Sequence, residues 1–161
     1  MNFSRRDLIV LLPALAAADA AAQQQKKGPE KADSGPPPVL GSKTYEFNDM
    51  PERVNATKTG KTRMVDTGIT TRGLKLSMHL SELAPGAFPH LPHQHLNEEA
   101  IILREGTLEV ELHSKIGEFG HGQTSRIGPG SLIWVASNDP HGMRNVGQTW
   151  AKYSVVEIGD R

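Results

Sequence analysis

Histidines and glutamates are concentrated in one short stretch of the sequence, PHLPHQHLNEEAIILREG, at residues 89–106. Three of the seven histidines lie in six consecutive residues of this stretch, 90–95. Glu98 and Glu99 follow shortly after them. The chain has no cysteine, so any metal ion must be held by nitrogen and oxygen ligands. Imidazole with carboxylate suits Fe, Mn, Ni, Zn or Cu(II). The stretch is therefore a candidate metal site, and the alternative interpretation is a polar loop in contact with water.

Four side chains form the predicted ligand set. His93 and His95 lie two residues apart, so on a β-strand their imidazoles would project from the same face. Glu99 lies four residues beyond His95, and a short turn at residues 96 and 97 would return its carboxylate to that side. A second histidine-containing segment, NDPHGMRN, supplies His141 as the fourth candidate. The predicted metal ligands are thus His93, His95, Glu99 and His141.

Three other residues could take part in this site, and the sequence assigns each of them elsewhere. Glu98 is the alternative carboxylate ligand, but strand alternation places it on the face opposite Glu99. His90 lies three residues before His93 and reaches the site only if its loop curls inward. His79 falls on the polar side of an alternating segment, which predicts contact with water. The predicted ligand set leaves all three out.

The segments that must position these residues have the two-residue period of β-strands. Apolar and polar residues alternate between residues 74 and 81 and again between residues 108 and 113. We expect the apolar side of each segment to be buried and the polar side to be exposed. Further strand candidates are residues 100–103, 131–135 and 150–158.

Glycine and proline interrupt the chain every few residues, with 16 Gly and 11 Pro in total. They mark many short strands joined by turns. No long segment beyond the N-terminal region shows the 3.6-residue period of an amphipathic helix. The sequence therefore predicts an all-β fold, either a sandwich or a barrel.

Length and charge restrict the classes of protein to consider. With 161 residues, 37% of them hydrophobic, the chain has enough material for one domain with a real core. Lysine plus arginine and aspartate plus glutamate balance at 18 each. This balance gives no indication of binding to nucleic acid or to an anionic membrane surface.

The N-terminal residues have the pattern of an export signal. MNFSRRD is positively charged, LIVLLPALAAA is apolar, and ADAAAQ offers small residues at cleavage-site spacing. About twenty apolar residues are needed to span a bilayer, so no stable membrane anchor is expected. Arg5 and Arg6 also resemble the twin-arginine export motif, which implies export of the folded protein. We expect a signal peptide at residues 1–22 and a periplasmic or secreted product.

The residues after the signal change in composition. QQQKKGPEKADSGPPP is polar and rich in proline, and it has too little apolar surface to fold on burial. We therefore expect a disordered, flexible linker at residues 23–38 and a β-barrel domain at residues 39–161.

Two motifs in the sequence resemble those of the cupin superfamily, in its small single-domain form. The first motif has a glycine, a His-x-His pair, a glutamate and a closing glycine, and here these are Gly86, His93, His95, Glu99 and Gly106. Only the first gap, of six residues, is one residue longer than usual. The gaps after the histidine pair and after the glutamate, three and six residues, follow the family pattern.

The second motif has a glycine, a Pro-x-Gly turn, a histidine and an asparagine, matched here from Gly130 through His141 to Asn145. Ala136 and Asn138 replace the proline and glycine of the turn. Asparagine tolerates the left-handed backbone conformation better than other residues after glycine, so the turn can be kept.

The resemblance implies a double-stranded β-helix, or jelly roll, with His93, His95, Glu99 and His141 converging inside it. It also implies a divalent transition metal, a small-molecule substrate or ligand and a homodimer. We favour a dioxygenase-like oxidoreductase over an isomerase or lyase, and the alternative is a non-catalytic cupin that binds a metal or small ligand. Folded export allows Mn or Fe to be loaded before Zn or Cu can compete, so Mn or Fe is favoured over Ni, Zn and Cu.

Overall fold

The structure is a computed structural model that describes residues 35–160. The predicted signal peptide at residues 1–22 and most of the predicted linker at residues 23–38 lie outside the described residues. Within residues 35–160, no helix has the length and apolar character that crossing a membrane requires.

The described residues form β-strands joined by turns, which confirms the all-β prediction. The helical structure among them is η1 (Phe47–Asp49), a single 3-10 turn. The strands are β1 (Glu52–Val54), β2 (Gly60–Ile69), β3 (Lys75–Leu83), β4 (Glu98–Glu105), β5 (Leu108–Leu112), β6 (Gln123–Ile127), β7 (Leu132–Val135), β8 (Gly142–Asn145) and β9 (Ala151–Ile158).

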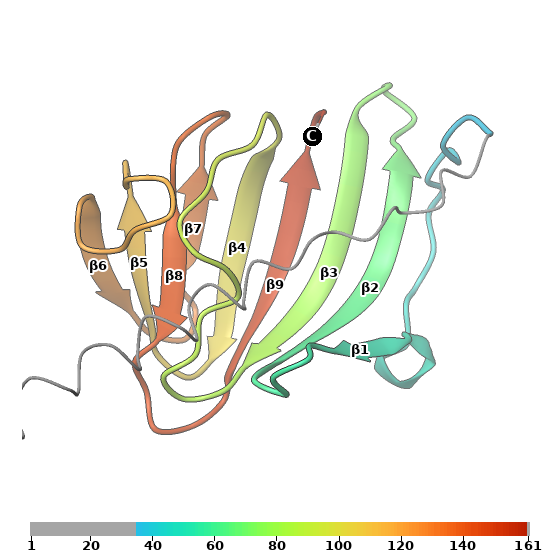
Figure 1. Cartoon of the computed structure of the whole chain (residues 1–161). Helices are drawn as coiled ribbons and strands as arrows, with labels where there is room; N and C mark the ends of the chain where they lie inside the picture. The colour runs from blue at the N-terminus through green and yellow to red at the C-terminus, as the bar shows by residue number, and fades with distance from the viewer. Residues whose placement is uncertain (1–34, 161) are drawn as a thin grey trace, which may run out of the picture. The chain divides into compact units, whose positions relative to one another are not determined.

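These strands form two antiparallel sheets. The larger sheet has the order β1-β2-β3-β9-β4-β7, and the smaller has the order β6-β5-β8. Figure 1 shows the small sheet beside the end of the large one formed by β4 and β7, while β3 and β2 continue away from it. This arrangement of short antiparallel strands is the predicted jelly roll.

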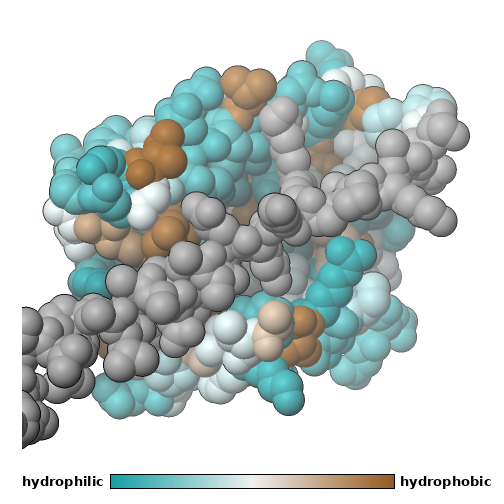
Figure 2. All heavy atoms as spheres, viewed as in Figure 1, coloured by the Kyte–Doolittle hydropathy of each residue, from teal (hydrophilic) through white to brown (hydrophobic). Residues whose placement is uncertain are grey.

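The hydrophobic core lies between the two sheets. Alternate residues of β4, β7 and β9 turn inward, among them Ile101, Ile133 and Val155, which are 3%, 6% and 4% exposed. The small sheet contributes Val110 from β5 and Met143 from β8. In the view of Figure 2, hydrophilic residues dominate the surface, and apolar residues occur singly or in small groups. Burial of these side chains is the main favourable contribution to folding.

The alternation in β3 is the reverse of the prediction. Ser77 and Ser81, expected on the exposed side, are 9% and 5% exposed and share the inner face with Leu83. Small hydroxyl side chains tolerate this position when partnered, and Ser81 Oγ lies 3.5 Å from Thr62 Oγ1 on β2. The prediction that His79 contacts water is likewise wrong as to face, because His79 shares the inner face and is half-buried.

Candidate metal centre

His90, His93 and His95 lie in the connection between β3 and β4 rather than on a regular strand, which corrects the prediction for His93 and His95. The backbone N–H of His93 donates to the carbonyl of His141 (3.0 Å), and the N–H of His141 donates to the carbonyl of His93 (2.9 Å). This single bridge joins the segments that carry the two sequence motifs. The bridge, not strand alternation, brings the imidazoles together.

The second segment is shaped by two asparagines. Asn138 has a φ of +60°, so it adopts the left-handed conformation expected of it, and its N–H donates to the carbonyl of His95 (2.8 Å). Asn145 is completely buried. Its amide donates to the carbonyls of Leu83 and Thr149, both at 2.8 Å, and its oxygen accepts from the N–H of Gly147. Asn145 therefore fixes the turn after β8.

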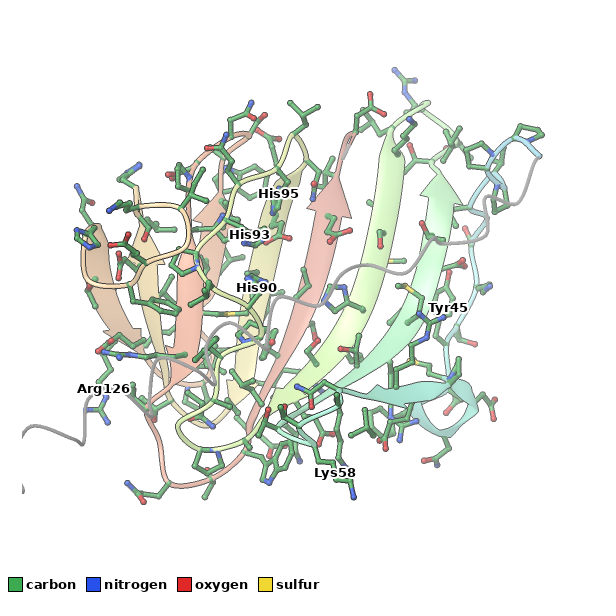
Figure 3. All side chains as sticks on the ribbon, in the orientation of Figure 1. Tyr45, Lys58, His90, His93, His95 and Arg126 are labelled. Carbon is green, nitrogen blue, oxygen red and sulfur yellow. The ribbon has the colours of Figure 1, made fainter. Side chains whose placement is uncertain are left out.

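All four predicted ligand residues meet between the sheets. One ring nitrogen from each of His93, His95 and His141 lies within 4.8 Å of the others. Glu99, on the inner face of β4 and 8% exposed, places Oε1 3.2 Å from His95 Nε2 and Oε2 3.5 Å from His141 Nε2. Glu98 belongs to the other face of the same strand. Figure 3 shows His95, His93 and His90 one below another along the β3–β4 connection.

The hydrogen bonds of these rings leave nitrogen lone pairs for a metal ion. The Nδ1 atoms of His95 and His141 lie 2.8 and 2.9 Å from the carbonyl oxygens of Asn97 and Asp139. A carbonyl only accepts, so each Nδ1 carries the proton and each Nε2 the lone pair. His93 Nδ1 and His95 Nε2 are buried and form no hydrogen bond. Buried polar atoms seldom lack a hydrogen-bond partner. Three imidazoles with one carboxylate are a set of donors that fits a divalent transition metal.

Charge favours the metal-binding forms of His93 and Glu99, whereas at His141 burial is outweighed by contact with Glu99, which raises the pKa of that ring. Burial, with the neighbouring imidazoles adding to it, lowers the pKa of His93 to about 3, so this ring is neutral. Burial alone would raise the pKa of Glu99, but contact with His141 and the other histidines outweighs it, and the pKa falls below its ordinary value. A neutral imidazole and an ionised carboxylate are the forms that bind metal.

A small cavity adjoins the cluster, and His90 lines it. The cavity measures about 20 Å³, slightly more than a water molecule needs. The His90 ring centroid lies 3.9 Å from that of His93. The sequence did not assign His90 to the site, because its spacing from His93 fits no strand face; the inward curl of the loop brings it there. The walls of the cavity are His90, Glu99, Ile101, Val110, Ile133, His141, Gly142 and Met143.

The loop between β5 and β6 packs beside the cluster through Phe119. The Phe119 ring meets that of Phe88 edge-on at 5.7 Å. A Cβ added to Gly142 would lie 2.8 Å from Phe119 and 2.9 Å from Pro92, closer than such atoms pack. The loop can therefore approach His141 this closely because its neighbour is glycine.

Glu111 holds the same loop, a role that strand alternation had concealed. Its carboxylate accepts hydrogen bonds from the Ser114 hydroxyl and from the backbone N–H groups of Gly120, His121 and Gly122, at 2.6 to 2.9 Å. Burial opposes its charge, but these donors prevail and lower the pKa of Glu111 to about 2. In the sequence, only the glycine-rich composition of the loop indicated that its backbone N–H groups could bind a carboxylate.

Comparison with known proteins agrees with this fold. Residues 79–157 match the family model described as Cupin domain. A search of curated proteins gave no significant match.

Solved structures resemble the chain at low sequence identity. The polyketide cyclase RemF from Streptomyces resistomycificus is 21% identical, with a TM-score of 0.56 over 75% of this chain and 82% of its own. KdgF from Halomonas sp. is 16% identical, with a TM-score of 0.58 over 75% and 96%. A single-residue variant of oxalate decarboxylase from B. subtilis is 22% identical, with a TM-score of 0.54 over 74% and 30%.

At such identities, a structural likeness establishes the fold and leaves the activity open. The family match at residues 79–157, the two histidine motifs within it and the jelly roll agree with one another. Residues 79–157 are therefore similar to a cupin domain in sequence, and the described residues have the jelly-roll fold of the cupin structures.

Proposed function

We propose that this protein is a metal-dependent, dioxygenase-like oxidoreductase that acts on a small organic molecule. The observation that carries the proposal is the cluster of three imidazoles beside a cavity, in which His93 Nδ1 and His95 Nε2 are buried and form no hydrogen bond. His93, His95, Glu99 and His141 would hold the metal. A divalent transition metal supplies Lewis acidity and, if it is redox-active, a route to oxygen chemistry.

The chain's own groups then set the conditions for that chemistry. The carbonyls of Asn97 and Asp139 hold the His95 and His141 rings with Nε2 available. Glu99 contributes a negative charge next to both rings. Aliphatic side chains, including Ile101 and Ile133, line the cavity and make part of its wall apolar.

We further propose that Mn or Fe is the metal in the cell, with Ni, Zn and Cu as alternatives. A site of imidazoles and one carboxylate does not itself prefer Mn or Fe, since affinity for Zn and Cu is higher. Loading before export would provide the selection, if Arg5 and Arg6 direct export of the folded chain to the periplasm or the medium.

The test is metal analysis of protein purified from its own compartment, together with oxygen-uptake screening against small organic molecules. Mn or Fe and substrate-dependent oxygen uptake are expected. An Arg5→Lys, Arg6→Lys double variant should not be exported, because the twin-arginine motif is read specifically while a general signal needs only positive charge. Normal export of that variant, or zinc in the native protein, would break the link between export route and metal.

A non-catalytic metal- or ligand-binding cupin is the second candidate, and the small cavity favours it. Among the described residues that line the cavity, His90 is the one group able to move a proton that is not also a predicted metal ligand. If the metal-loaded protein binds small ligands but consumes no oxygen with any of them, this second function is the correct one.

We also propose that the protein is a homodimer that associates through the outer face of the large sheet. Register places two rows of side chains there, crossing β3, β9, β4 and β7. Ile102, Leu132 and Trp134 in these rows are 41%, 61% and 47% exposed. Contiguous apolar surface of this kind is typical of an interface. The rows are Met78, Val156, Ala100 and Trp134, and Leu80, Ser154, Ile102 and Leu132.

Isologous packing of this face against a second copy would bury both rows at once. Sedimentation equilibrium should therefore give a dimer mass, and Leu132→Lys should give a monomer. Ile116→Lys is the matched control, because Ile116 is 57% exposed on the β5–β6 loop, away from these rows. A dimer that survives Leu132→Lys would place the interface elsewhere.

A further inference from the structure

The loop between β5 and β6, residues 113–122, is hydrogen-bonded to both segments that carry the predicted histidine ligands. The backbone N–H of Gly117 donates to the carbonyl of Pro92, and that of Ser114 donates to the carbonyl of Pro140, each at 2.7 Å. Each of these prolines directly precedes one of the two histidines that form the bridge described above. The loop therefore holds the same two segments that the bridge joins.

A third contact reaches the second segment through a side chain. The backbone N–H of His113 donates to Asp139 Oδ1 (3.1 Å), and the carbonyl of Asp139 accepts from Nδ1 of His141 (2.9 Å). His113 has a φ of +52°, a conformation that residues other than glycine seldom adopt. The hydrogen bond helps to keep this strained backbone in place. Because the donor is a backbone group, alanine at this position leaves the contact intact.

Glu111 anchors the loop to β5. It is 4% exposed, and its carboxylate accepts hydrogen bonds from three consecutive backbone N–H groups at residues 120–122 and from the Ser114 hydroxyl. Ser114 thereby makes two contacts at once, because its hydroxyl donates to Glu111 at 2.6 Å and its N–H donates to Pro140 at 2.7 Å. A single residue thus connects the anchoring carboxylate to the segment that contains His141.

These contacts bear on metal binding because the ligands they hold lie outside the strands. His93 lies in the β3–β4 connection, and His141 lies directly before β8. Fixing the backbone of a connecting segment costs conformational entropy. When hydrogen bonds formed on folding have already offset this cost, the binding of the ion does not have to offset it again. A loop that holds both segments should therefore raise the affinity for metal without supplying a ligand.

We propose that the β5–β6 loop positions His93 and His141 for metal binding, and that Glu111 is the positioning residue that holds the loop in place. The inference rests on the proposed metal centre and adds to it a carboxylate that acts through the loop and not as a ligand. Loss of the Glu111 contact should leave the ligand set unchanged and weaken its hold on the ion.

Titration of the full-length protein with Co²⁺ tests the proposal, because the visible absorption of this ion depends on its coordination geometry. Glu111→Gln keeps the length of the side chain and removes the charge that attracts the four donors. The dissociation constant for Co²⁺ should rise about tenfold at neutral pH, as is typical when a partner that orients the ligands is lost. The absorption of the bound ion should change as well, while one ion still binds per chain. Both quantities are measured where circular dichroism shows the variant to be folded, so a loss of stability alone moves neither.

Glu109→Gln is the matched control. Glu109 lies on the other face of β5 and pairs with Arg144, so this variant removes the same charge and leaves the loop in place. Its dissociation constant and absorption spectrum should equal those of the unchanged protein. If Glu111→Gln also equals the unchanged protein in both, the proposal is overturned.

Amide hydrogen exchange gives a second test that needs no variant to fold. If the loop positions the ligands in advance, the amides of Ser114 and Gly117 in the unchanged, metal-free protein should exchange as slowly as those of β5. Fast exchange that slows only when Co²⁺ binds would mean that the metal orders the loop, which is the reverse of the proposal.

Failure of this inference and failure of the proposed function give different results. If the unchanged protein and Glu111→Gln bind Co²⁺ equally well, the metal centre stands and the role of Glu111 is wrong. If the unchanged protein binds no Co²⁺, the metal centre is wrong and the inference is wrong with it. Metal binding as described without oxygen uptake would remove the enzymatic function and leave the inference standing.

Discussion

At the scale of single residues, the candidate site depends on which ring nitrogens are free. His95 and His141 each commit Nδ1 to a backbone carbonyl, so each offers Nε2. The backbone thus chooses the tautomer before any metal arrives, which favours binding by rings that need not reorient. His113, which faces solvent and pairs with Asp139, has no such arrangement.

Alanine at any of the three clustered histidines should therefore strip the metal. We expect His93→Ala, His95→Ala and His141→Ala each to lower metal content at least about tenfold, because each removes a direct bond. Elemental analysis after dialysis measures this, with His113→Ala as the matched control. Glu98→Ala should also keep the metal; if it does not while Glu99→Ala does, the carboxylate has been assigned to the wrong residue.

A substitution at Gly142 tests how tightly the β5–β6 loop is packed. Gly142→Ala should cost about 1–3 kcal/mol of unfolding free energy, as overpacking does, because its new methyl group would meet Phe119 and Pro92. Gly128→Ala is the control, since nothing lies within 4 Å of a Cβ there. Urea denaturation compares the two variants, and equal costs would mean that the loop gives way freely.

At the scale of elements, the connections position the site and the strands support them. The bridge between His93 and His141 and the bond from Asn138 to His95 join the two motif segments. Glu111 binds the β5–β6 loop through four donors. All of these contacts except the one from the Ser114 hydroxyl use backbone groups, which explains why side-chain patterns alone did not predict them.

The Glu111 contact makes stability depend on pH. Its folded pKa of about 2 lies below the ordinary 4.5, so the stabilisation is complete above about pH 4.5 and is lost as the pH falls toward 2. Glu111→Gln should therefore cost roughly 2–3 kcal/mol at pH 7 and progressively less below pH 4.5. Denaturation at pH 7 and at pH 3 measures both values. Glu109→Gln, on the other face of β5 and paired with Arg144, is the control and should show a small effect at either pH.

At the scale of the whole molecule, sequence patterns predicted the core strands well and the edges poorly. β4, β7 and β9 have alternating apolar residues that pack inward, and these were found. β2 and β6 have mixed or exposed residues and are held mainly by pairing with their neighbours, which no residue period reveals. Likewise the motif spacing gave the four clustered residues, but the place of His90 depends on a loop path that only the fold determines.

Metal binding should raise the stability of the entire domain, because the cluster joins the β3–β4 connection, β4 and the segment before β8. At a free Mn²⁺ concentration about 100 times the dissociation constant, the free energy of unfolding should rise by about 2.7 kcal/mol. Thermal denaturation with and without a chelator measures this rise. His93→Ala should show no such increase, and an equal increase in that variant would mean that the metal binds elsewhere.

The outer face of the large sheet contains a tryptophan whose fluorescence can report on association. The chain has two tryptophans; Trp134 is 47% exposed within the apolar rows, and the Trp150 ring lies under Lys61 Nζ at 5.6 Å. In a Trp150→Phe variant, all tryptophan emission comes from Trp134. If two copies associate through this face, dilution should shift the emission to longer wavelength as the indole returns to water, and the midpoint gives the dissociation constant of the dimer. An emission maximum that does not change with concentration would mean that this face stays in water.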